Sequence, residues 1–217
     1  MEEIVWYSPA WKGRAMAGTQ STGVCLGCGL KFSKRGIAKH LSGCFSGAPG
    51  SPAGIHLIAD GGGPYWLHLF ANSDTRFESL DAFLRKIWLE CCGHMSEFHG
   101  DRGQVGKRAK LSTALGPGGR IRYEYDMGST TQLEIRFLGA IRAPAGKTRI
   151  RLLARNDPPA FVCAGCGKPA EMICPFCGHS AAGLLCRRCS KGHACDDDVE
   201  LLPLVNSPRT GVCGYTG

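Results

Sequence analysis

Hydrophobic positions in the middle of the chain predict one helix over residues 79–91. They recur at helical spacing at Leu80, Phe83, Leu84, Ile87, Trp88 and Cys91. Glu78 and Asp81 lie near the expected start, where acidic side chains favour the positive end of the helix dipole, and Gly93 follows the end. The pattern is typical of a helix with one face against a hydrophobic core.

Shorter apolar segments on either side of this helix predict strands. Turn residues separate these segments, which lie at residues 55–59, 65–70, 95–98, 120–126, 131–138 and 148–154. One helix against four or five mostly antiparallel strands gives an α+β fold. We therefore predict an α+β domain over residues 54–157.

Changes in composition mark the two ends of this domain. A stretch rich in Gly, Pro and Ser precedes it, and Pro158 and Pro159 follow it. The chain of 217 residues therefore divides into an N-terminal unit of residues 1–45, the central domain, and a C-terminal unit of residues 158–217. Ten of the 13 cysteines, together with two histidines, stand at zinc-ligand spacings in the two outer units.

The N-terminal unit contains one group of four predicted ligands. Cys25 and Cys28 form a Cys-x-x-Cys pair, and His40 and Cys44 follow at a separation of four residues. That separation places both side chains on the same face of a helix, so both can reach one ion. Four ligands without an open position predict a structural zinc site. The spacing resembles a zinc finger of the Cys-Cys-His-His class, with Cys44 in place of the last histidine.

The C-terminal unit contains eight predicted ligands in four pairs. The pairs are Cys163 and Cys166, Cys174 and Cys177, Cys186 and Cys189, and His193 and Cys195. Eight donors predict two closed zinc sites, which brings the expected total to three Zn²⁺. A cross-braced arrangement joins the first pair to the third, whereas a sequential arrangement joins the first to the second. Only seven residues separate the first two pairs, which favours cross-bracing. His179 is a spare ligand that could replace His193.

Cys91, Cys92 and His94 allow two interpretations. Adjacent cysteines on a helix point about 100° apart and rarely share one metal ion, so a buried Cys91 that packs as a small hydrophobic residue is the favoured one. His94 would then cap the end of the helix. A fourth metal site, or a redox role, is the alternative, with a further ligand from His68, His99 or Cys213.

Net charge bears on the partners of the protein. The formal charge is +8 at pH 7. Three zinc sites would lower it to about +4, because bound cysteines are thiolates. Basic residues gather at Lys31, Lys34, Arg35 and Lys39, and again in the loop 102–122. Such regions suit nucleic acid, although a solvated basic surface or a protein partner explains them equally well.

The sequence contains no known catalytic constellation. It lacks a Gly-x-Ser-x-Gly elbow, a His-Glu-x-x-His helix and a Walker loop. The first 18 residues do not form a secretory signal, so we expect a reducing, cytoplasmic location. We predict a non-enzymatic, zinc-binding interaction protein that binds protein or nucleic acid. The alternative is a metalloenzyme or thiol redox protein that uses the central Cys91, Cys92 and His94.

Two segments of the central domain resemble a known family. The runs YWLHLFANSDTRFESLDAFLRKIWLECCGHMSEF and YEYDMGSTTQLEI look like the plasmid pRiA4b ORF-3-like family, over about residues 54–155. The ending NSPRTGVCGYTG looks like that of zinc-ribbon-bearing relatives. The resemblance implies an α+β fold and, for most members, no established activity.

The resemblance includes one departure and one match. Many members carry Asp, Trp and His where this chain has Ser129, Thr131 and Leu133, so no role of that polar trio carries over. Tyr125, Asp126 and Gly128 do match. We interpret the latter two as turn residues: Asp126 as the cap, and Gly128 as the source of an unusual backbone angle.

Overall fold

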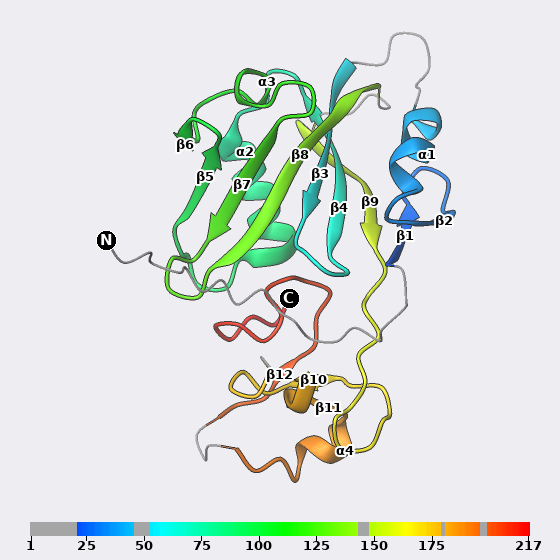
Figure 1. The fold of residues 1–217 in the computed structure, drawn as a ribbon, viewed down its shortest axis with the longest axis vertical. Coiled ribbons are helices and arrows are strands. Elements are labelled where there is room, and N and C mark those ends of the chain that lie inside the picture. Colours follow the sequence, from blue (N-terminus) through cyan, green and yellow to red (C-terminus); the bar gives the residue numbers. More distant parts are fainter. Residues whose placement is uncertain (1–20, 46–52, 143–147, 179–180, 196–198) are drawn as a thin grey trace.

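One antiparallel sheet runs through both the N-terminal and the central segments of the chain (Figure 1). The computed structural model describes residues 21–45, 53–142, 148–178, 181–195 and 199–217. In this part of the chain the sheet has nine strands, in the order β2-β1-β9-β4-β3-β8-β7-β5-β6. Their bounds are β1 Thr22–Cys25, β2 Lys31–Ser33, β3 Ala53–Asp60, β4 Trp66–Asn72, β5 Ser96–Gly100, β6 Gly103–Val105, β7 Arg120–Tyr125, β8 Thr131–Arg142 and β9 Ile150–Asn156. The predicted α+β fold is confirmed.

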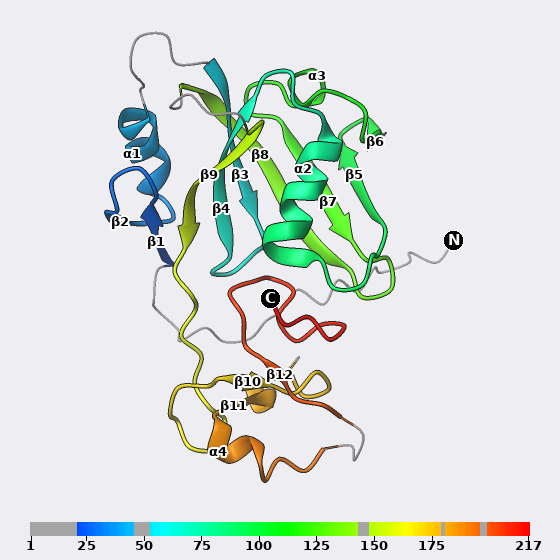
Figure 2. The same ribbon diagram turned by 180° about the vertical axis from the view of Figure 1, so that it is seen from behind.

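The helix that covers the inner face of the sheet is α2, Phe77–Leu84, which continues as a π-helix over Arg85–Leu89 (Figure 2). The prediction of one regular helix over residues 79–91 was therefore wrong at both ends. The helix begins two residues earlier, and its last turn is wider. Glu90 has an extended backbone that ends the helix, so Cys91 and Cys92 lie beyond it. This early end matters for the site described below.

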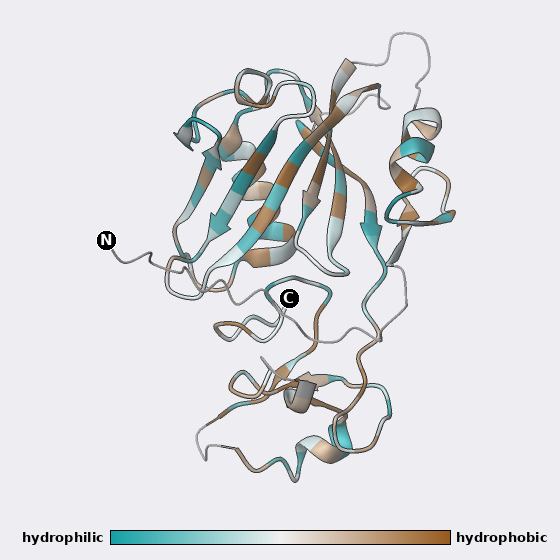
Figure 3. Ribbon diagram, viewed as in Figure 1, coloured by the Kyte–Doolittle hydropathy of each residue, from teal (hydrophilic) through white to brown (hydrophobic). Residues whose placement is uncertain are grey.

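Alternating apolar positions on the strands form the main core. Figure 3 shows the resulting bands of hydrophobic and hydrophilic residues along the central strands. Leu80, Leu84 and Trp88 of the helix are buried in the core. The side chains that the sheet contributes include Leu57, Leu67, Leu69, Ile121, Tyr123, Tyr125, Leu133 and Ile135. The opposite face of β7 and β8 carries charged pairs instead, as expected for an antiparallel sheet with one solvated face.

The N-terminal segment is attached to the sheet in two ways. Strand β1 pairs with β9, with Gly23 opposite Asn156. A side chain at Gly23 would meet Trp66 and the carbonyl of Arg155, so only glycine allows this approach. Helix α1, Ile37–Cys44, also lies against the outer face of the sheet. The second core formed there contains Cys25, Ile37, Leu41, Phe45, Ile58, Trp66, Phe70, Ile141, Leu153 and Ala154.

The C-terminal segment forms a small module, residues 158–203, which is followed by a tail, residues 204–217. The module contains the strands β10 Met172–Ile173, β11 Leu184–Leu185 and β12 Leu202–Pro203, a 3-10 turn at Ala181–Gly183, and helix α4 Arg187–Ser190. The tail then returns to the central domain and lies between it and the module (Figures 1 and 2). Ser207 fixes the tail by donating a hydrogen bond of 2.6 Å from its hydroxyl to the carbonyl oxygen of Trp88.

Because α1 packs against the sheet, shortening a side chain at this contact should lower the free energy of unfolding of the whole protein. Leu41 is fully buried, so Leu41→Ala should lower the free energy of unfolding by about 2–5 kcal/mol, because it leaves a cavity. Leu30, which is 59% exposed, provides the matched control. Leu30→Ala should change the free energy by less than about 0.5 kcal/mol. Urea denaturation of the full chain measures both values, and equal losses would contradict this packing.

Candidate metal centres

Cysteine and histidine side chains converge in four groups in the described part of the chain. In each group, one ligand atom from every residue lies within 4.8 Å of the others. Three of the groups consist of the twelve residues singled out by spacing: Cys25, Cys28, His40 and Cys44; Cys163, Cys166, Cys186 and Cys189; and Cys174, Cys177, His193 and Cys195. The fourth group consists of Cys91, Cys92, His94 and Cys213. Such groups suggest metal binding, and there are four of them where the sequence predicted three.

The N-terminal group is built by a tight turn and a helix. The turn between β1 and β2 closes through the amide of Gly29, which donates to the carbonyl oxygen of Cys25 at 2.8 Å. Helix α1 supplies the other two ligands from one face. The sulfurs of Cys25 and Cys44 lie 3.6 Å apart, and His40 Nε2 lies 3.3 Å from the sulfur of Cys28. Cys25 is fully buried, so this group is anchored in the second core.

The C-terminal module interleaves its two groups along the chain. The first Cys-x-x-Cys pair lies with the third, and the second pair lies with His193 and Cys195. This is the cross-braced arrangement. Sulfur separations are 3.6 Å between Cys166 and Cys186 and 3.4 Å between Cys177 and Cys195. His179, the spare ligand, lies outside the described residues.

The distances and charges in these groups suit a tetrahedral divalent ion. Zinc–sulfur bonds of about 2.3 Å place the sulfurs of one tetrahedral site roughly 3.8 Å apart, close to the separations above. Backbone hydrogen bonds, first of them at Cys186, lower the pKa of Cys163 to about 6. Hydrogen bonds with Cys166, Cys186 and Cys163 raise the pKa of Cys189 to about 12. Neighbouring thiolates oppose each other's ionisation, and a bound cation removes that opposition.

The fourth group depends on the early end of the π-helix. Cys91 and Cys92 lie in a bend after Glu90, outside the helix, so the angle of 100° that separates neighbours on a helix does not apply to them. Their sulfurs lie 3.7 Å apart. His94 Nε2 lies 3.0 Å from the sulfur of Cys92 and 3.2 Å from that of Cys213. Cys91 does pack against the main core as predicted, but it is only half-buried, and its sulfur also lies among the ligand atoms of this group.

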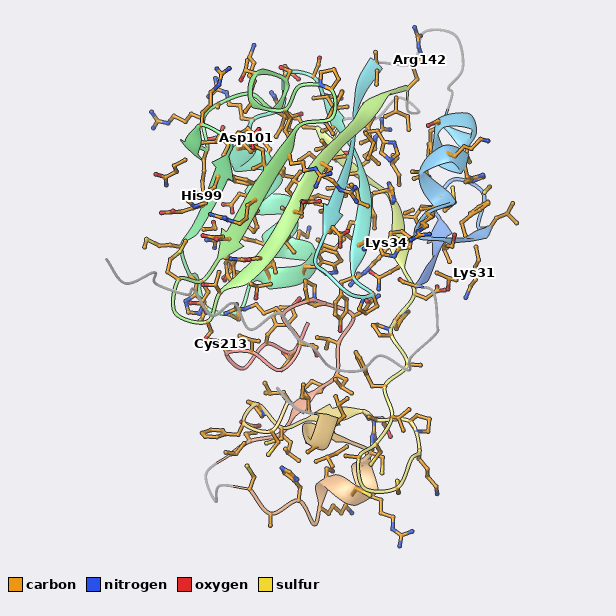
Figure 4. The ribbon with its side chains drawn as sticks, in the orientation of Figure 1. Lys31, Lys34, His99, Asp101, Arg142 and Cys213 are labelled. Carbon is orange, nitrogen blue, oxygen red and sulfur yellow. The ribbon has the colours of Figure 1, made fainter. Side chains whose placement is uncertain are left out.

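The two histidines considered for a fourth site lie elsewhere. His68 Nδ1 is 2.9 Å from His56 Nε2 on the outer face of the sheet. Burial lowers the pKa of His68 to about 3 and that of His56 to about 4, so both rings are neutral at pH 7. His99 Nε2 is 3.2 Å from a carboxylate oxygen of Glu97. Of the three proposed ligands, only Cys213 joins the group. Figure 4 shows Cys213 at the lower end of the central domain and His99 higher on the sheet.

A buried ion pair holds the tail beside this fourth group. Arg209 is fully buried, and its Nη2 donates to Asp126 Oδ2 at 2.6 Å. Arg209 Nη1 donates to Thr131 Oγ1 at 3.1 Å, and its guanidinium lies 4.8 Å from the centre of the Tyr125 ring. The same Nη2 lies 3.5 Å from the sulfur of Cys91. The ion pair therefore connects the tail to the turn between β7 and β8.

Asp126 is the unusual residue of that turn. Its Oδ1 accepts hydrogen bonds from the amides of Gly128 and Ser129, as expected for a capping residue. The left-handed backbone angle, φ 67°, belongs to Asp126 itself and not to Gly128 as expected. Burial acts to raise the pKa of Asp126, but the hydrogen bonds from Arg209 and these amides outweigh it and lower the pKa. Asp126 is therefore a carboxylate at neutral pH.

Comparisons with known proteins add little to this geometry. No protein-family model matches the chain, and no curated protein is significantly similar to it. A solved structure described as a protein of unknown function, MM3350 from Methanosarcina mazei Go1, is similar over part of the chain. It is 20% identical, with a TM-score of 0.42, and the similarity covers 48% of this chain and 70% of that one.

Among the described residues, no helix combines the length and the apolar character that crossing a membrane requires.

Removal of one predicted ligand should have a local effect. Cys174→Ser should lose one zinc ion and open the C-terminal module, because metal binding supplies folding free energy to such modules directly. We expect hydrogen exchange in residues 172–195 to rise by at least about a hundredfold, while residues 21–45 remain protected. Native mass spectrometry gives the zinc content. The control is Ser190→Ala in the same module, and an unchanged zinc content in Cys174→Ser would contradict the assignment.

Removal of the buried guanidinium should be costly. Arg209→Met leaves the Asp126 carboxylate without its partner, so we expect a loss of about 3–5 kcal/mol in the free energy of unfolding. Addition of Asp126→Asn should restore much of this loss, since asparagine tolerates the left-handed angle and carries no charge. The control, Arg142→Met, changes an exposed arginine. If Arg209→Met is as stable as the control Arg142→Met, the ion pair does not hold the tail.

Proposed function

We propose that this chain is a zinc-binding, non-enzymatic interaction protein. In this proposal the three groups of the terminal modules hold structural zinc. The main support is that each group supplies four protein ligands, which leaves no coordination position for water or substrate. Catalytic zinc sites keep such a position open. We also propose that the central domain is a relative of the pRiA4b ORF-3-like family, on the residues that carry the resemblance.

Charge distribution argues against nucleic acid as the partner. Two of the expected phosphate contacts are already in ion pairs: Lys31 with Asp157 at 3.2 Å and Lys34 with Asp60 at 2.8 Å. Arg35 and Lys39 remain exposed near one edge strand, β2. The loop 102–122 lies at the other edge, where it includes the edge strand β6. Figure 4 shows these two ends of the sheet, marked by Lys31 and by Asp101. Eight strand spacings separate them, on the order of 40 Å.

Ion pairs engage three of the six basic side chains of this loop: Lys107, Arg120 and Arg122. The loop is not irregular throughout, since it contains β6 and the short helix α3, Leu111–Ala114. Lys107 Nζ lies 2.9 Å from a carboxylate oxygen of Asp81. Arg122 Nε lies 2.9 Å from a carboxylate oxygen of Glu124. Four metal groups in place of three would further reduce the formal charge, from +8 to about +3. These features favour a protein partner.

Exposed apolar side chains indicate where a protein partner would dock. Most of the large ones stand on or beside the cysteine turns. Leu26 is 56% exposed between Cys25 and Cys28, and Phe176 is 67% exposed between two ligands of the C-terminal module. Single exposed apolar residues are common on proteins, but their position at the tips of rigid metal-held turns suits recognition.

Substitution of these tips tests the proposal. We expect Leu26→Ser with Phe176→Ser to reduce co-purification of the partner protein from cell extract at least about tenfold, equivalent to about 1.4 kcal/mol or more of binding free energy. The control is Leu138→Ser, which changes an exposed leucine of β8 outside the metal groups. Equal recovery with both variants would contradict docking at the tips.

Two further measurements separate the alternatives. Mobility shifts with DNA and RNA at two salt concentrations test the nucleic-acid version, because phosphate contacts weaken steeply with salt. A strong, salt-sensitive shift that Arg35→Glu with Lys39→Glu abolishes would replace the protein partner by nucleic acid. A thiol probe tests the version with a metalloenzyme or redox centre at Cys91, Cys92 and His94. Fast labelling of Cys91 and Cys92 in the zinc-loaded protein would favour that version.

A further inference from the structure

We propose that Cys91, Cys92, His94 and Cys213 form a fourth zinc site that clasps the C-terminal tail to the central domain. This proposal is independent of the partner proposed above. The donor set, three thiols and one imidazole, is one that structural zinc uses. Three of its members are close together in sequence, whereas Cys213 lies 121 positions after Cys92. A metal ion here would therefore bridge two distant parts of the chain.

The positions of the ligand atoms suit a tetrahedral ion. The sulfur of Cys92 lies 3.7 Å from that of Cys91 and 3.8 Å from that of Cys213. A tetrahedral zinc site requires sulfurs roughly 3.8 Å apart. The Cys213 sulfur also lies 3.2 Å from His94 Nε2. The fourth member, Cys91, completes a group in which all ligand atoms lie within 4.8 Å of one another.

The backbone is held in uncommon conformations at both halves of this group. Gly93 has φ 84°, and this turn allows His94 to face the same point as Cys92. Cys213 has φ 51°, one of two positive values among the described non-glycine residues, the other being that of Asp126. A left-handed conformation is unfavourable for a non-glycine residue. Such strain persists where the surroundings determine the position of the side chain, and at Cys213 it directs the sulfur into the group.

Neighbouring residues provide charge balance and support. Zn²⁺ with three thiolates carries a net charge of −1. The buried guanidinium of Arg209, which also pairs with Asp126, lies 3.5 Å from the sulfur of Cys91 and offsets part of that charge. Glu90 fixes the turn from the other side, since its Oε1 accepts from the amide of Gly93 at 2.6 Å and from the Tyr125 hydroxyl at 3.1 Å. The group is thus surrounded by second-layer contacts of the kind that orient metal ligands.

Exposure distinguishes this group from the other three. Each of the terminal-module groups includes at least one buried cysteine. Cys92 and Cys213 are exposed, and Cys91 and His94 are half-buried. A chelator can therefore reach the ion here more easily than elsewhere. We infer that the fourth site loses its metal first, and that its loss frees the tail while the three other sites stay filled.

Cys213→Ser tests the clasp on the full chain. We expect native mass spectrometry to find four zinc ions in the wild-type protein and three in the variant. Hydrogen exchange in residues 206–217 should increase at least about tenfold in the variant, whereas residues 21–45 and 161–195 should not change. Thr216→Ser, an exposed change in the same tail, is the control.

A second variant and a second measurement complete the test of the fourth site. Cys92→Ala, which alters the other half of the site, should give the same count of three if Cys213→Ser does not fold. After loading with cobalt, either variant should show about a quarter less thiolate-to-metal charge-transfer absorption than the wild-type protein, because one of four such sites is lost. Three ions in the wild type, or four in both variants, would overturn the clasp. Neither result would affect the partner proposal, which is tested on Leu26 and Phe176.

Discussion

The ion pair between Arg209 and Asp126 is the contact on which the lower end of the molecule depends. It buries a guanidinium completely and joins the tail to the turn between β7 and β8. Such a pair is favourable only when further hydrogen bonds satisfy both groups. Here Thr131, the carbonyl of Ser129 and two backbone amides supply such hydrogen bonds, and within this pair only the Nε of Arg209 is buried without a partner among the described residues. With Arg209 in place, the tail runs past the end of the π-helix and Cys213 reaches His94.

The C-terminal module is connected to the rest of the protein at both of its ends. The chain leaves the sheet through β9, forms the cross-braced module, and comes back through the tail. Asn156, at the end of β9, donates a hydrogen bond to the side chain of Asn206 at 2.7 Å, so the outgoing and returning segments meet. A module held at both ends has far fewer orientations than one on a single linker. Its cysteine-bearing turns are therefore presented in a defined direction.

Much of this arrangement could be predicted from sequence, and the omissions share a physical cause. Ligand spacing is local, so the turns around Cys25, Cys163 and Cys174 are evident from a few residues each. Period-two alternation likewise identifies the strands of the central domain. The fourth group was only the less favoured alternative, because it depends on where a helix ends, and a π-helical turn has no clear sequence signal. Its last ligand also comes from a distant part of the chain. Pairing of β1 with β9 is non-local in the same way, and the approach of Gly23 to Trp66 is visible only in three dimensions.

That pairing has a consequence for the order of events during synthesis. Thr22 and Asp157, which are joined by a hydrogen bond at the start of β1 and the end of β9, are 135 positions apart. The first module leaves the ribosome long before its docking strand exists. Metal binding can organise its short loop at once, because all four ligands lie within about 20 residues of one another. Docking must wait for β9, since contacts of high sequence separation form late. Until then the apolar face of Ile37, Leu41 and Phe45 remains uncovered, and the nascent chain is most prone to association during this interval.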